Sequence, residues 1–143
     1  VAVRSSPTHH FIDTSIATAA LGIKPADLLN DLNSFGFFFE DMAVRDLSIY
    51  AESFHGELKH YRDSKGLEVD AILKLVNGEY GAIEIKIASD KNILEGINSL
   101  TKFESKMKEN GIKTPTFKMI LTSHGPSKKV GDIYIVPISM LGL

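Results

Sequence analysis

The chain has 143 residues, which suffices for one domain with a sizeable buried core. Apolar residues make up 43% and charged residues 24%, a composition that excludes a disordered chain. There is no cysteine, which excludes disulfides and thiolate metal sites, and the net charge of −2 argues against a dedicated non-specific nucleic-acid binder, which would be basic.

The N-terminal segment predicts a small helical lead-in. Asp13 or Thr14 can cap a short helix over residues 15–21, and Pro25 fits the first turn of a second helix. The apolar run in this segment is too short to span a membrane, so we expect neither a targeting nor a transmembrane segment. Because the chain begins at Val1, we expect a piece of a longer protein, and the lack of cysteine suits a cytoplasmic one.

Two longer helices are expected further along the chain. Ser34 offers a cap for a helix over about residues 36–54, which ends near His55 and Gly56. Asp90 caps a second helix over about residues 91–109. The apolar residues of this second helix share one face and predict its buried side: Ile93, Ile97, Leu100 and Met107.

The remaining ordered segments have the pattern of strands. Five strands are predicted, over residues 57–63, 67–76, 80–88, 117–122 and 133–136. Residues 123–131 are expected to form a polar loop. The order of helix, three strands, helix and two strands predicts an α/β fold, in which an antiparallel meander is extended into a mixed sheet.

The register of the second and third strands decides which side chains meet. The odd-numbered positions of both strands are apolar, so burying both sets together requires odd residues to face odd residues. A two-residue turn at 77–78 would pair Asp70 with Ile85 and set apolar residues against charges. A three-residue loop over 77–79 instead pairs Asp70 with Lys86, and we predict this loop.

That register gathers charged side chains on one face of the hairpin. Asp70, Glu84 and Lys86 project from it together, with Glu68 on the same side. Glu40 joins them from the preceding helix, on a stripe with Phe37, Val44, Leu47 and Ala51. The opposite helix face is expected to be solvated and holds Asp41, Arg45, Ser48 and Glu52. A carboxylate on an apolar stripe needs a metal ion, a lysine or backbone donors as its partner.

Simpler explanations stay open for these residues. A charged strand face is commonly solvated or forms a cross-strand ion pair, and Lys86 or helix-terminal N–H groups could satisfy Glu40. The five histidines show no ligand spacing, and there is no phosphate-binding glycine loop. Two lysine groups are expected to be solvated, although either could contact a phosphate backbone: Lys128 and Lys129, and Lys102, Lys106 and Lys108.

Asp70 followed by Glu84-Ile85-Lys86, with Glu40 on a preceding helix, resembles the PD-(D/E)XK, or restriction-endonuclease-like, superfamily. Val69 stands where that superfamily has the proline of its name. The whole chain also resembles the C-terminal domain of unknown function attached to many bacterial and archaeal AAA+ ATPases. The matching stretches are residues 4–7, 11–13, 31–33, 35–36, 45–47, 50–51, 61–63, 66–70, 82–86 and 136–138.

The resemblance implies a lead-in over residues 1–35 packed on a nuclease-like core over 36–143, in one compact domain downstream of an AAA+ ATPase module. It further implies a Mg²⁺- or Mn²⁺-dependent nuclease that binds DNA through a local patch. Asp70, Glu84 and Glu40 would then hold the metal, and Lys86 would act with them in catalysis.

A non-catalytic module is the alternative expectation. It would bind nucleic acid or protein partners, or regulate the attached ATPase. The acids Asp70 and Glu84 would then be satisfied in an ion-pair network by Lys86, with Lys74 or Arg62.

Overall fold

The computed structural model describes residues 32–141. The predicted lead-in helices lie outside these residues. In chain order the elements are α3 (Leu32–Glu52), β1 (Glu57–Arg62), β2 (Glu68–Lys74), β3 (Tyr80–Lys86), α4 (Asp90–Glu109), β4 (Phe117–Thr122), β5 (Lys128–Val130), β6 (Ile133–Pro137) and the 3-10 helix η1 (Ile138–Leu141).

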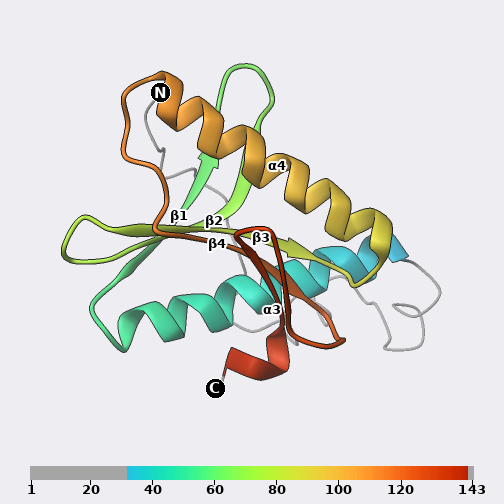
Figure 1. Cartoon of the computed structure of the whole chain (residues 1–143). Helices are drawn as coiled ribbons and strands as arrows, with labels where there is room; N and C mark the ends of the chain where they lie inside the picture. The colour runs from blue at the N-terminus through green and yellow to red at the C-terminus, as the bar shows by residue number, and fades with distance from the viewer. Residues whose placement is uncertain (1–31, 142–143) are drawn as a thin grey trace.

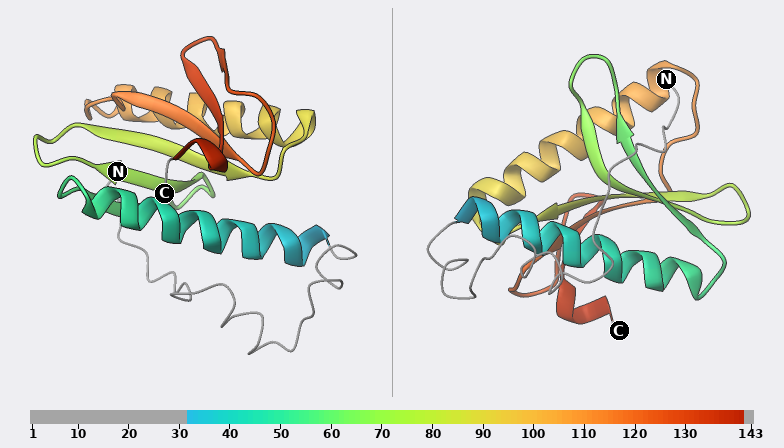
Figure 2. Two further views of the ribbon diagram at one scale, coloured as in Figure 1. Left: turned by 90° about the horizontal axis from the view of Figure 1, so that it is seen from below. Right: turned by 180° about the vertical axis from the view of Figure 1, so that it is seen from behind.

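All six strands form one mixed sheet, in the order β1-β2-β3-β4-β6-β5. The meander of β1, β2 and β3 is antiparallel, β4 is parallel to β3 and to β6, and β5 runs antiparallel along the edge. Helix α3 lies on one face of the sheet and α4 on the other (Figures 1 and 2). The predicted α/β class, with its meander and mixed sheet, is confirmed.

Each face of the sheet carries its own apolar core. The core beneath α4 is centred on side chains that are almost wholly buried: Ile72, Ala82, Leu100, Phe103, Met107 and Ile120. The core beneath α3 contains Phe39, Ala43, Leu47, Ala51, Ala71, Leu73, Ile83 and Leu121. The predicted buried face of α4 is therefore correct. Along the described residues, no helix is long and apolar enough to cross a membrane.

Several predicted boundaries are wrong, for local reasons. Helix α3 begins at Leu32, so Ser34 lies inside the helix and does not cap it. Ser89 caps α4 in place of Asp90, because the Ser89 hydroxyl accepts the Asn92 N–H at 3.1 Å. The segment predicted as a polar loop contains β5, whose residues are all exposed and therefore lack a strand's apolar pattern.

The solvent-facing side of α3 also differs from the prediction. Phe39 and Ala43 pack on the sheet, which turns Phe37 away from it, and Phe37 is 53% exposed. Asp41, predicted to be solvated, is buried. Glu40 is half-buried.

An ion pair ties the turn between β1 and β2 to helix α4. One oxygen of Asp63 accepts the N–H groups of Lys65 and Leu67 at 2.8 and 3.0 Å, and the other accepts from Lys106. The Asp63 carboxylate thus orders the turn and joins it to the helix. The predicted solvation of Lys106 is wrong, because its ammonium group has a carboxylate partner contributed by a different element.

Replacing Asp63 by asparagine keeps the acceptor for the two N–H groups and removes the charge. Lys106 lowers the pKa of Asp63, and Asp63 raises the pKa of Lys106. The pair therefore stabilises the fold fully between their ordinary values of 3.8 and 10.5. We expect Asp63→Asn to lower the melting temperature at neutral pH, and the difference from wild type to shrink as the pH falls below 3.8. Melting curves across this pH range check it, and a difference independent of pH would contradict it.

Candidate functional site

Asp70 lies where strands β2 and β3 separate. Their ladder runs from the Lys74–Tyr80 pair to the Ala71–Ile83 pair. Beyond this last pair, the Asp70 side chain accepts the Ile85 N–H at 2.7 Å and takes the place of a strand partner. The register of β1 against β2 also shifts at this point, so Asp70 belongs to an irregular stretch of β2. Such irregularities redirect side chains, and the hydrogen bond from Ile85 fixes this one.

The predicted register of β2 and β3 is correct in pairing odd residues with odd residues. It is wrong in which odd residues it pairs. The loop does have three residues, but they are 76–78, since the Leu75 N–H donates to Glu79 O at 2.9 Å. Gly78 is the last loop residue and has a φ of 84°. A three-residue hairpin loop places its left-handed glycine at this position, which the prediction of 77–79 overlooked. Extending the ladder sets Asp70 opposite Glu84 rather than Lys86.

Glu84 is a buried acid on the α4 side of the sheet, only 3% exposed. Helix α4 comes close to it at Gly96, where an added Cβ would lie 3.7 Å from the Glu84 Cβ. Burial raises the pKa of Glu84 to about 10, helped by the hydrogen bond with Asp70 and by its charge. Lys86 lowers this pKa and Glu40 raises it further. The two facing carboxyl groups therefore favour an added positive charge, either a proton or a cation.

Lys86 and Glu40 both act on this carboxyl pair through their charges. Lys86 follows Glu84 on the same face of β3, and its Nζ lies 4.0 Å from Glu95 on α4. The charge of Glu40 raises the pKa of Glu84. Within residues 32–141, no three His, Asp or Glu side chains gather as a metal-binding group. The structure thus pairs Asp70 with Glu84, sets Lys86 in the same cleft, and adds the charge of Glu40.

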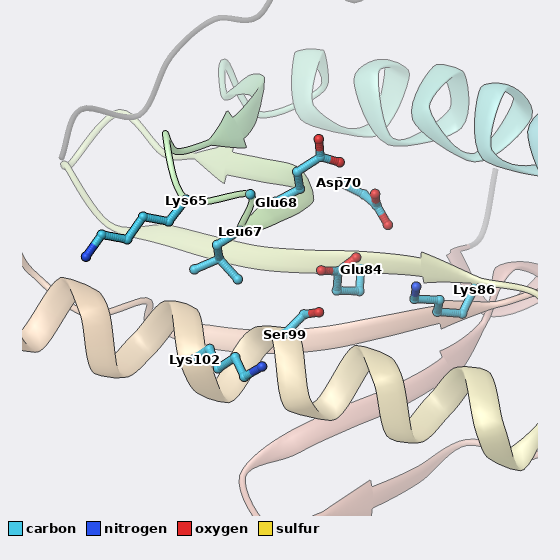
Figure 3. A pocket seen from close by; sticks show the side chains of 9 residues that line it. Lys65, Leu67, Glu68, Asp70, Glu84, Lys86, Ser99 and Lys102 are labelled. Carbon is cyan, nitrogen blue, oxygen red and sulfur yellow. The ribbon is translucent and has the colours of Figure 1, made fainter.

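The carboxyl pair opens into a cleft of about 440 Å³ between the β1–β2 turn, β3 and α4 (Figure 3). Its lining consists of Lys65, Gly66, Leu67, Glu68, Asp70, Glu84, Lys86, Ser99 and Lys102. No motif or spacing indicated Ser99. Lys102 was expected to be solvated, and only the orientation of α4 over the sheet shows that it faces the acids.

Fold and cleft together define an α/β domain with an acidic, lysine-flanked site at the point where two strands diverge. Residues 35–141 match the family described as Domain of unknown function (DUF4143), and the chain belongs to this family. No curated protein and no solved structure matches the chain.

Proposed function

We propose that this domain is a Mg²⁺- or Mn²⁺-dependent phosphodiester hydrolase that acts on DNA. The observation that carries the proposal is the pairing of Asp70 and Glu84 in an open cleft, with Lys86 beside them. The resemblance to the PD-(D/E)XK superfamily adds support, because its characteristic acids and lysine correspond to these three residues.

The residues present fit a small divalent cation. Carboxylate oxygens are the ligands that Mg²⁺ prefers, and Asp70 and Glu84 would hold it with water completing the coordination. The raised pKa of Glu84 shows that the two facing carboxyl groups are stabilised by an added positive charge, which such an ion would supply. When bound, the ion would acidify its water and offset the charge on the scissile phosphate. Glu40 would add negative charge near the site, either through water or as a further ligand.

Residues of the chain itself would position the metal ligands and the attacking water. The Ile85 N–H holds Asp70 in place before any ligand arrives, so little reorganisation is needed. Lys86 would orient the attacking water and stabilise the extra negative charge at phosphorus. The ammonium group of Lys86 is available for this role, because Glu95 is its distant and half-exposed partner.

The alternative, a non-catalytic module stabilised by an ion-pair network, predicted different contacts. Arg62 pairs with Glu68 at 2.5 Å and Lys86 with Glu95. No ion pair between described residues joins Asp70 or Glu84 to a lysine or arginine within 4.0 Å. This arrangement of ion pairs supports the catalytic proposal.

The resemblance to domains attached to AAA+ ATPases supplies a proposed partner. An upstream ATPase module in a longer chain would move DNA or open it, and would deliver it to this cleft. In that arrangement the domain itself needs only a local patch for DNA, which is compatible with its net charge of −2.

Lys86→Ala tests the proposal on single-stranded, double-stranded and branched DNA with Mg²⁺ or Mn²⁺. We expect the wild type to cleave at least one of these substrates and the variant to be slower by about 10²- to 10⁴-fold. Since Glu95 is exposed, losing the pair should change the free energy of unfolding by less than about 1 kcal/mol.

Lys91→Ala is the matched control, because Lys91 is an exposed lysine of α4 outside the cleft lining. It should leave both rate and stability unchanged. Absence of cleavage by the wild type, together with a strongly destabilised Lys86→Ala variant, would overturn the catalytic proposal in favour of a structural role.

A further inference from the structure

We propose that Lys102 and Lys65 hold the phosphate backbone of a single nucleic-acid strand at the end of the cleft remote from Lys86. This inference rests on the proposed function and specifies its substrate as a single strand bound through its backbone. The two lysines come from different walls of the cleft: Lys102 from helix α4 and Lys65 from the turn between β1 and β2.

The order of side chains along the cleft defines a path. In Figure 3, Lys86 lies on one side of Glu84, while Lys65 and Lys102 lie on the other, with Ser99 between Glu84 and Lys102. Positive charge therefore stands on both sides of the carboxyl pair. A strand whose scissile phosphate meets the carboxyl pair would place a neighbouring phosphate at Lys102.

Lys65 and Lys102 differ from Lys106 and Lys118, which have carboxylate partners. Lys106, one turn further along α4, pairs with Asp63, and Lys118 pairs with Glu104 and Asp132. Among the ion pairs of the described residues, none within 4.0 Å involves Lys65 or Lys102. Their ammonium groups belong to the lining of the cleft, where a phosphate can reach them.

The two walls are also held together. The Lys65 N–H donates to Asp63, and Asp63 accepts from Lys106 of α4. The turn that carries Lys65 is thereby braced against the helix that carries Lys102. This brace sets the separation of the two walls before a strand binds, which reduces the ordering cost of binding.

The size and lining of the cleft select a single strand and backbone contacts. A volume of about 440 Å³ lies in the range of small-molecule sites, which suits a short piece of one strand. Among the described residues, the lining has no aromatic ring on which a base could stack. Phosphate contacts position a strand without reading its sequence, so binding should be independent of sequence.

The test measures the binding of a labelled single-stranded oligonucleotide by fluorescence anisotropy, in EDTA to prevent cleavage, over about 50 to 200 mM salt. We expect Lys102→Gln and Lys65→Gln each to weaken binding and to reduce the salt slope of log K by about 0.7. Lys108→Gln is the control, an exposed lysine of the same helix outside the cleft lining. The matching duplex should bind more weakly than the single strand.

Three results would overturn the inference: no binding by the wild type, unchanged slopes in the two variants, or an equal loss in Lys108→Gln. Hydrolysis of bis(p-nitrophenyl) phosphate separates this inference from the proposed function, because so small a diester reaches the carboxyl pair without needing Lys102. Turnover of this diester by the wild type, and at the same rate by the Lys108→Gln control, is expected. Turnover of this diester with unchanged strand binding in the variants would reject the two lysines and leave the hydrolase proposal standing.

Discussion

Replacing Glu84 by glutamine is expected to reduce Mg²⁺-dependent hydrolysis by about 100-fold or more while the fold persists. The amide matches the protonated acid in shape, and its N–H can donate to Asp70 as the acid does. It cannot supply a carboxylate to a cation, however. Addition of Mg²⁺ should therefore raise the melting temperature of the wild type and leave that of Glu84→Gln unchanged.

The same substitution should change how stability depends on pH. Burial and Asp70 raise the pKa of Glu84 in the folded chain to about 10, from an ordinary value of 4.5. Between these values the folded state keeps a proton that the unfolded state releases, so the free energy of unfolding falls as pH rises. Glutamine does not titrate. We therefore expect Glu84→Gln to match the wild type at acid pH and to become progressively more stable than it in alkaline buffer.

Urea unfolding at acid, neutral and alkaline pH, without divalent ions, measures this effect. Glu95→Gln is the matched control, because Glu95 is a half-exposed acid of α4 that contacts Lys86 across the rim of the cleft. It should change neither the pH dependence nor the response to Mg²⁺. Parallel pH curves for the wild type and Glu84→Gln would show that Glu84 ionises normally, and that burial beside Asp70 does not raise its pKa.

The sequence predicts features that depend on neighbouring residues better than features that depend on contacts between distant segments. Local periodicity located β4 at its observed bounds and gave the buried face of α4. The alternation of apolar residues likewise fixed which faces of β2 and β3 meet. The alignment along the hairpin was wrong, because it depends on which loop position Gly78 occupies, and the apolar pattern is the same for both alignments.

Local sequence patterns could not predict ion pairs between residues that are far apart in the chain. Asp63 and Lys106 are 43 residues apart, and nothing in either neighbourhood indicates that they pair. Lys118 is almost completely buried in a strand, where it is satisfied by Glu104 and Asp132 from other elements. The sequence likewise suggested Asp70, Glu84 and Lys86 as a cluster, but the opposite wall of the cleft requires the placement of α4 over the sheet. The alternation of residues along a strand does not predict where α4 lies over the sheet.

Phe103 holds α4 in that placement, and Phe103→Ala is expected to lower the free energy of unfolding by about 3–5 kcal/mol. Its ring is fully buried and meets Tyr61 edge-to-face at a centroid distance of 4.9 Å, with Tyr80 at 6.4 Å. Truncation to alanine removes these contacts and leaves a cavity beneath the helix. Phe103→Leu fills most of the space and should lose only about 1 kcal/mol, largely the ring–ring contact.

Chemical denaturation of both variants measures the two losses, and Leu94→Ala supplies the control. Leu94 is 58% exposed on the same helix, so its truncation should change stability by less than about 0.5 kcal/mol. Equal losses from Phe103→Ala and Leu94→Ala would mean that α4 is not anchored through Phe103. Because Lys102 precedes Phe103 on this helix, loosening the anchor also moves one wall of the cleft. Phe103→Ala should therefore weaken strand binding more than Phe103→Leu does, even where both variants remain folded.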